Sequence, residues 1–168
     1  MLMVIVGASL SMLGACAADV AAPRVPVLTG GAAPVVEVAG TAMPSKGQAL
    51  LLSFLDLGPS AGAASRSQLA VVKSMATQYS RAGLSIAVVD TSGLSQEQLV
   101  NVGYDWDLHY PDLHLLPLSD AKGLVRLYQP KVPDTTLIAP DGTVQARWQG
   151  VVVPAQALAP PLKRLQSP

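Results

Sequence analysis

The chain has 168 residues, of which 50% are hydrophobic and only 4% are aromatic. This length suffices for one domain with a core built mainly from aliphatic side chains. Eleven basic and eleven acidic residues cancel to a net charge of zero, without a run of either sign. Electrostatic binding of nucleic acid needs a basic surface, so the composition excludes that class of partner.

The first segment combines an export signal with the single cysteine of the chain. In MLMVIVGASLSMLGACAADV an apolar run over residues 1–15 precedes Cys16. Its length fits the apolar part of a signal peptide and is short for a membrane-spanning helix, which needs about 20 residues. The residues LGAC resemble a bacterial lipobox. The resemblance implies that Cys16 becomes a lipid-carrying N-terminus and anchors the protein to a membrane of the bacterial cell envelope, outside the cytoplasm.

One feature departs from this pattern, because no Lys or Arg precedes the apolar run, although signal peptides usually begin with one. A misassigned start codon would explain the departure. A plain secretory signal, which leaves Cys16 unmodified and the protein secreted, remains open, as does an ordinary apolar helix with a buried cysteine. If Cys16 is lipidated, the folded part of the chain has no thiol for a disulfide or for cysteine chemistry.

Composition divides the chain into three parts. Residues 1–16 form the signal peptide with its lipobox, residues 17–33 form a tether rich in Ala, Pro and Gly, and residues 34–168 form the folded domain. At the start of this domain, VVEVAG (residues 35–40) favours a short edge strand.

Two continuous apolar runs predict strands that are buried on both faces. They are ALLLSFLD, which ends at a turn signal, and LSIAVVD, which spans Leu84–Asp90. The sequence between them predicts a helix over residues 65–82, which a capping box of Ser65 and Gln68 opens and Gly83 ends. A strand, a helix and a strand in this order predict a right-handed parallel crossover.

The second half of the chain predicts shorter elements. A second capping box in SQEQ opens a helix near residues 96–102, LHLLPLS favours an interrupted strand, and DAKGLVRLY favours a helix over residues 120–128. TTLIA and TVQARWQG flank the turn PDG and predict a β-hairpin. The segment PAQALAPPLKRL predicts a closing helix, which Pro160 and Pro161 would kink or shorten.

The order of these elements resembles the thioredoxin-like superfamily, in its exported redoxin or TlpA-like type. KVPDTTLIAPDGTVQARWQG (residues 131–150) is similar to the VPTTFLIDPDGKVVARWVG type of segment in those proteins. GQALLLSFLDL is similar to their strand before the redox loop. YDWDLHYPDL is similar to the region of those proteins that has the pattern W…P.L. The resemblance covers about residues 34–165. It implies an α/β thioredoxin-like fold, in which a central mixed β-sheet has helices on both faces.

The same resemblance implies a cis-proline. In that family the Pro that follows Val is cis and faces the active site. This carries over to Pro133, because Val132, Pro133, Thr135 and Thr136 match the motif. Asp134 is a polar residue that departs from it.

Members of that family read roughly FWATWCPPCRAEMPEL from this strand to the next helix, and the loop holds their two redox cysteines. The corresponding stretch of this chain is SFLDLGPSAGAASRSQL. Counted without gaps from Phe54, the two cysteines fall on Pro59 and Gly62. No cysteine follows Cys16, so no shift of register restores a CxxC motif, and the thiol of peroxiredoxins is also missing. Ser65 would cap the helix that follows the loop. Otherwise the free N–H groups at the start of that helix would remain available to an anion such as a carboxylate. A plain flexible connection explains the loop more simply.

Other candidate chemistry is weaker. Asp107, His109, Asp112 and His114 lie within DLHYPDLH, but Pro111 breaks regular geometry, and we expect no metal and no cofactor. A Ser–His–Asp hydrolase would need a motif such as GxSxG, which does not occur.

Asp90 ends a central parallel strand, where α/β sheets place functional groups. It is equally suited to accept hydrogen bonds from the loop that follows.

Three functions remain open. The first is a membrane-anchored extracytoplasmic protein of thioredoxin-like fold without thiol redox chemistry, which binds an unknown protein or peptide. The second is a thiol-disulfide oxidoreductase or peroxiredoxin-like enzyme in cell redox homeostasis, as fold similarity alone suggests. The third is a purely structural envelope lipoprotein. The candidates for the binding groove are Ser60, Ser65, Val132, Pro133 and Thr135.

Overall fold

The computed structural model describes residues 29–38, 40–45, 47–79 and 83–165. The signal peptide, with Cys16, and most of the tether lie outside these residues. In the described part of the chain, no helix has the length and apolar character needed to cross a membrane.

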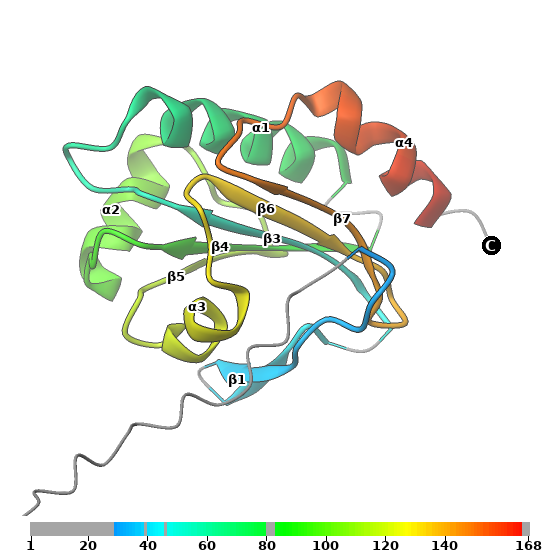
Figure 1. Ribbon diagram of the computed structural model, residues 1–168. Coiled ribbons are helices and arrows are strands. Elements are labelled where there is room, and N and C mark those ends of the chain that lie inside the picture. Colours follow the sequence, from blue (N-terminus) through cyan, green and yellow to red (C-terminus); the bar gives the residue numbers. More distant parts are fainter. Residues whose placement is uncertain (1–28, 39, 46, 80–82, 166–168) are drawn as a thin grey trace, which may run out of the picture.

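A five-stranded mixed sheet forms the centre of the molecule (Figure 1). Its strand order is β5-β4-β3-β6-β7, in which β4 is parallel to β3 and β5, and β6 is antiparallel to β3 and β7. The strands are β3 (Ala49–Leu55), β4 (Leu84–Asp90), β5 (Leu113–Leu116), β6 (Asp134–Ile138) and β7 (Val144–Gln149). The predicted buried strands, the parallel crossover and the hairpin are confirmed.

Helices cover both faces of this sheet, as the resemblance to the thioredoxin-like superfamily implies. The helices α1 and α4 lie on one face, and α3 lies on the other with a separate hairpin of β1 and β2 (Figure 1). The helix α2 packs along β5. The bounds of these elements are α1 (Ala63–Tyr79), α2 (Gln96–Asp105), α3 (Lys122–Tyr128), α4 (Ala155–Leu165), β1 (Val36–Val38) and β2 (Thr41–Met43).

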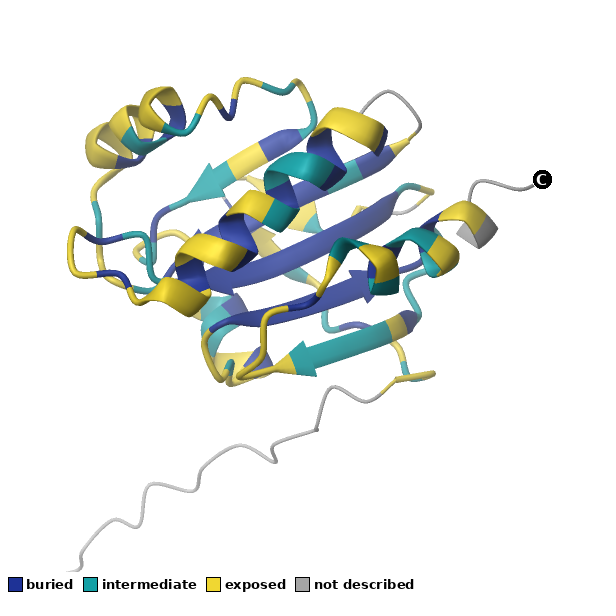
Figure 2. Cartoon of the chain, turned by 90° about the horizontal axis from the view of Figure 1, so that it is seen from above, coloured by how far each residue is buried: buried dark blue, intermediate teal, exposed yellow. Residues whose placement is uncertain are grey.

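Alternating side chains of β3 build a core on each face of the sheet. Leu51 and Leu55 pack in the core under α1 and α4, while Leu50, Leu52 and Phe54 pack in the core that α3 and β1 cover. The central strands are buried at nearly every position, and the helices are buried only along the side that faces the sheet (Figure 2). The strand is therefore apolar at nearly every position because it serves two cores.

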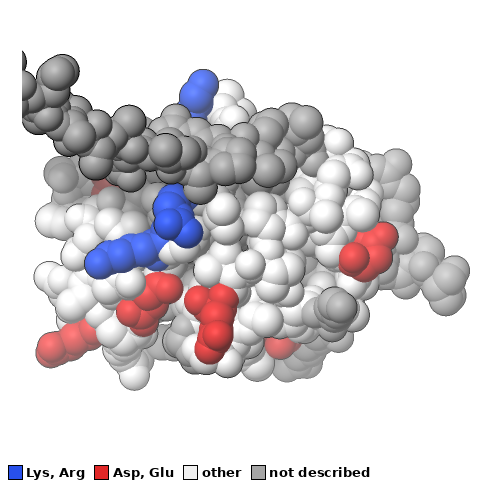
Figure 3. All heavy atoms as spheres, turned by 60° about the horizontal axis from the view of Figure 1, so that its bottom comes forward, with Lys and Arg blue, Asp and Glu red and all other residues white. Residues whose placement is uncertain are grey.

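The face that carries α3 and the β1–β2 hairpin has few charged side chains. They stand in small groups of both signs, separated by uncharged surface (Figure 3). The described part of this face therefore offers no continuous basic surface for a nucleic acid.

The predicted capping box of Ser65 and Gln68 is wrong, because α1 begins two residues earlier than predicted. Both residues lie within the first two turns of α1, and their buried side chains make tertiary contacts. The Ser65 hydroxyl accepts a hydrogen bond from the N–H of Asp56 (3.2 Å), and Gln68 Oε1 accepts one from the N–H of Val153 (2.7 Å). These bonds tie α1 to the end of β3 and to the segment before α4.

The later helices agree better with the sequence. The capping box at the start of α2 is present, since Ser95 accepts from the Gln98 N–H and Gln98 Oε1 accepts from the Ser95 N–H. The final helix continues through Pro160 and Pro161, so the expected shortening does not occur. Leu162, directly after the prolines, is buried against the sheet, and this packing holds the last turns in place.

The end of the expected tether belongs to the folded part. Gly30 donates its N–H to the carbonyl of Val144 (2.7 Å), and Ala33 donates to that of Gly142 (2.8 Å). Residues 30–33 therefore line the β6–β7 turn, and the folded part begins upstream of the boundary expected from composition.

A buried ion pair joins β6 and β7 directly after Pro133. Asp134 is fully buried, and Arg147 places Nη2 at 2.6 Å from its Oδ2 and Nε at 3.2 Å from its Oδ1. Arg147 also donates to the carbonyl of Tyr128 (2.5 Å), and Gln149 donates to Asp134 (3.1 Å). Burial raises the pKa of Tyr128 to about 12 despite the nearby guanidinium. The residue that departs from the family motif is thus the anion of a buried network that ties α3 to the hairpin.

Replacing Arg147 by Met leaves the Asp134 carboxylate buried without its cation. We expect the free energy of unfolding, measured by urea denaturation, to fall by about 3–5 kcal/mol. The control is Asp107→Ala, which removes the exposed ion pair with Lys73 (3.3 Å) and should cost less than about 1 kcal/mol. Similar losses in both variants would contradict a special role for the buried pair.

Candidate binding site at the ends of the central strands

The register of the sheet brings several loops to one edge. Leu55, at the end of β3, pairs with Asp90 at the end of β4, and Phe54 pairs with Asp134 at the start of β6. The loops that follow β3 and β4 and the segment that precedes β6 therefore lie together. This is the edge where α/β sheets place their functional groups.

The segment before β6 contains the expected cis-proline, since the Val132–Pro133 peptide bond is cis. The N–H of Gly150 donates to the carbonyls of Lys131 (2.7 Å) and Pro133 (2.8 Å). These two bonds add the segment that follows β7 to the same edge. The N-terminal segment joins the fold at the β6–β7 turn, which lies at the opposite end of the sheet.

Three exposed valines stand on the two segments that Gly150 joins. Val132 is 39% exposed, Val151 51% and Val152 37%. Sequence reasoning named Val132 but missed the other two. A run of three valines after a β-hairpin strand was the available signal, since such a run has no polar residue to face solvent.

A single carboxylate fixes the loops after β3 and β4. Asp90 is fully buried and accepts hydrogen bonds from the N–H groups of Leu57 (3.1 Å), Ser92 (3.1 Å), Gly93 (2.7 Å) and Leu94 (2.8 Å), and from the Ser92 hydroxyl (2.6 Å). Burial alone would raise the pKa of Asp90. The hydrogen bonds, led by that of the Ser92 hydroxyl, outweigh burial and hold this pKa below its usual value.

The start of α1 locates the place where a redox helix would hold its thiols. A helix N-terminus stabilises a thiolate in the first residues of the helix. Gly62 directly precedes α1, and its carbonyl accepts the N–H of Arg66 (3.3 Å). Ser65 follows three residues later and is buried, whereas Pro59 lies in the exposed loop. Helix geometry thus favours Gly62 and Ser65 over the ungapped count of Pro59 and Gly62, and neither assignment contains a thiol.

The five groove candidates are not equally available to a partner. Ser60 and Val132 are exposed, and Pro133 is buried. The Ser65 hydroxyl is used inside the fold, and Thr135 Oγ1 lies in the core, 3.1 Å from a serine hydroxyl of β3. Ser65 and Thr135 therefore hold the fold together, and their hydroxyls do not face a partner.

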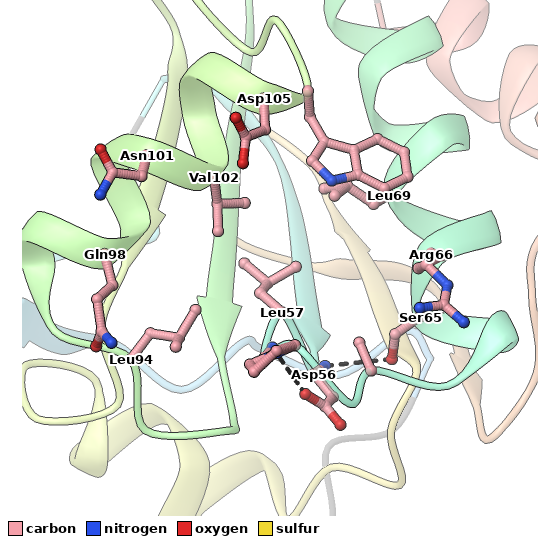
Figure 4. Close-up of a pocket in the computed structure, with 14 residues that line it drawn as sticks. Asp56, Leu57, Ser65, Arg66, Leu69, Leu94, Gln98, Asn101, Val102 and Asp105 are labelled. Carbon is pink, nitrogen blue, oxygen red and sulfur yellow. Dashed lines mark hydrogen bonds between the residues drawn. The ribbon is translucent and has the colours of Figure 1, made fainter.

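A cavity of about 360 Å³ opens between α1 and α2, above the loop that follows β3 (Figure 4). Of the five groove candidates only Ser65 lines it, so the cavity is separate from the exposed surface at Val132. Its polar side chains are Asp56 of the loop, Ser65 and Arg66 of α1, and Gln98, Asn101 and Asp105 of α2, and its bulky apolar ones are Leu57, Leu69, Leu94, Val102 and Trp106. Sequence reasoning missed this cavity, because its walls come from two segments that are distant in the sequence, residues 56–69 and 94–106.

Three of the residues considered as metal ligands have different surroundings. The His109 ring packs on Tyr104 (centroids 4.6 Å apart), Asp107 pairs with Lys73, and His114 is exposed on β5. Among the residues that the structure describes, no group of three or more His, Cys, Asp or Glu side chains is placed to hold a metal ion.

Replacing Asp90 by Asn removes one anionic acceptor from five donors, so we expect a loss of about 2–3 kcal/mol in the free energy of unfolding at pH 7. Because the folded pKa is lowered, this contribution is present above the unfolded pKa of about 3.9 and is lost as the pH falls through the folded pKa. Urea denaturation at pH 7 and pH 3 should therefore show the gap between wild type and variant narrowing on acidification. A gap that widens on acidification would contradict a lowered pKa.

No protein-family model matches the sequence, and no curated protein matches it. The structure is similar to the thioredoxin domain of a thiol-disulfide oxidoreductase from Bacteroides vulgatus (TM-score 0.63, 19% identity, 83% of this chain and 99% of that one). It is also similar to StoA from Bacillus subtilis (TM-score 0.59, 17% identity, 86% of this chain and 100% of that one). A third similar structure is peroxiredoxin Q from Xanthomonas campestris (TM-score 0.57, 20% identity, 73% of this chain and 82% of that one). At these identities the similarity establishes the fold, and the chain has a thioredoxin-like fold.

Proposed function

We propose that the chain is a membrane-anchored, extracytoplasmic protein of thioredoxin-like fold that binds a protein or peptide and does no thiol redox chemistry. The observation that carries this proposal is the start of α1, where Gly62 and Ser65 stand and no cysteine occurs anywhere after Cys16. The thiolate is the group that attacks and forms disulfides. A glycine and a buried serine supply no such group.

The path of the chain supports an anchored protein whose site is accessible. The N-terminal segment enters the fold at the β6–β7 turn, at the end of the sheet opposite the site. Lipid on Cys16 would attach the molecule from that end, through residues 17–29, which span at most about 45 Å. Attachment at that end would leave the loops at the ends of the central strands accessible to a partner.

The surface at Val132 supports binding of an extended chain. The carbonyls on either side of Val132 are used by Gly150, while no hydrogen bond of the Val132 main chain is found in the described part of the structure. An extended peptide can pair with such a backbone, and the exposed side chains of Val132, Val151 and Val152 can contact its side chains.

A redoxin-type oxidoreductase is the function that the names of the similar structures suggest. It would require that Cys16 remains free and acts between molecules, or that another group replaces the thiol. No contact at the start of α1 favours this function, and fold alone does not decide activity.

Replacing Val132 by Asp places a charge within the proposed apolar surface. We expect capture of the partner by the full chain from envelope extracts, quantified by mass spectrometry, to fall at least about tenfold. Thermal stability should not change, because Val132 is exposed.

Val35→Asp is the matched control, since Val35 is also exposed (61%) and precedes β1 on another part of the molecule. This variant should retain capture. Equal capture by both variants would show that the Val132 surface does not bind the partner.

A further inference from the structure

We infer that the cavity between α1 and α2 binds an uncharged, extended peptide segment through one bulky apolar side chain. This inference rests on the proposed function in one respect, that the ligand is a polypeptide. The site itself is distinct from the Val132 surface. Its volume of about 360 Å³ lies within the range of about 300–1,000 Å³ that is typical of binding sites.

The lower part of the cavity requires an apolar group. Leu57 stands between the two helices, with Leu94 and Val102 on the α2 side and Leu69 on the α1 side (Figure 4). These are branched aliphatic side chains without hydrogen-bonding groups. The hydroxyls of a sugar would lose their water here without finding partners, which costs free energy. An aliphatic or aromatic side chain would instead gain from burial.

The α2 wall matches a peptide backbone. Gln98 and Asn101 line the cavity with carboxamides, which donate and accept hydrogen bonds as a peptide group does. Gln98 Oε1 is held by the N–H of Ser95 (2.9 Å), so its amide group is positioned before a ligand arrives. The carboxylate of an aliphatic acid could accept hydrogen bonds from these NH2 groups but offers no N–H group for the amide oxygens.

The charges of the lining disfavour an anionic ligand. Arg66 lies on the α1 side and Asp105 on the α2 side, while Asp56 lies on the loop below. One cation and two carboxylates sum to a single negative charge, so the cavity does not attract an anion. Opposite signs on opposite walls suit the dipole of a neutral peptide segment.

The cavity is fixed before binding. The Asp90 carboxylate accepts hydrogen bonds from the N–H groups of both Leu57 and Leu94. These two bonds fix the distance between two apolar sides of the cavity. Asp56 accepts the N–H of Gly58 (2.9 Å), and its own N–H is held by Ser65. A preformed site avoids the cost of ordering these loops on binding.

The test uses the full chain with Trp148→Phe, which leaves Trp106 in the cavity lining as the single tryptophan. The probe is acetyl-Gly-Leu-Gly-amide, titrated against tryptophan fluorescence. We expect a saturable change, and at least about tenfold weaker binding of acetyl-Gly-Ala-Gly-amide, because alanine buries less apolar surface. Hexanoic acid and N-acetylglucosamine serve as probes of the two rival ligand classes.

Two valines of α2 give a matched pair of variants. Val102→Phe fills the cavity and should abolish the saturable change, whereas Val100→Phe alters an exposed valine outside the cavity and should leave the affinity within about twofold. Asn101→Ala, an exposed change that does not threaten folding, should weaken the leucine probe about fivefold through a lost hydrogen bond.

Absence of a saturable change, equal affinity for the alanine probe, or undiminished binding by Val102→Phe would overturn the inference. Tighter binding of hexanoic acid or N-acetylglucosamine than of the leucine probe would overturn it as well. These failures are separate from failure of the proposed function. If only the cavity is misassigned, Val132→Asp still loses partner capture, and if peptide binding at the Val132 surface is wrong, that variant retains it.

Discussion

The buried carboxylate of Asp90 holds together the edge of the sheet on which the candidate site depends. Its five hydrogen bonds come from the loops after β3 and β4, so a single anion sets the positions of Leu57 and Leu94. A buried charge is costly unless it is fully hydrogen-bonded, and here donors surround it. The loop before α1, one side of the cavity and the approach to α2 are therefore coupled through one side chain.

A second buried carboxylate lies at the same edge and is neutralised differently. Asp134 pairs with Arg147, while Asp90 is held by N–H and hydroxyl donors. Between these two anchors, Ser65 uses its hydroxyl to hold the N–H of Asp56. The edge thus keeps the rigid construction of a chemical site, but its side chains are engaged in structure. What remains exposed is apolar surface and a cavity, and the proposal of a binding function rests on these two features.

Local signals were sufficient for the elements but not for the site. The apolar runs of β3 and β4, the PDG turn and the capping box of α2 predict structure because each depends on neighbouring residues. The Ser65–Gln68 pattern failed, since tertiary partners distant in sequence compete for both side chains. The role of Asp134 was not visible in its local sequence, because its cation, Arg147, stands on the next strand. The cavity could not be predicted from sequence, as its walls meet only after the sheet has formed.

The most direct test restores thiols to the start of α1 in a chain that carries Cys16→Ala. Gly62→Cys fits, because no atom lies within 4 Å of the added Cβ, and Ser65→Cys keeps a similar shape. In an insulin-reduction assay with dithiothreitol, the account predicts no turnover above background for Cys16→Ala alone and clear turnover once both cysteines are present. Turnover by the Cys16→Ala chain without new cysteines would contradict the claim that this chain does no thiol redox chemistry.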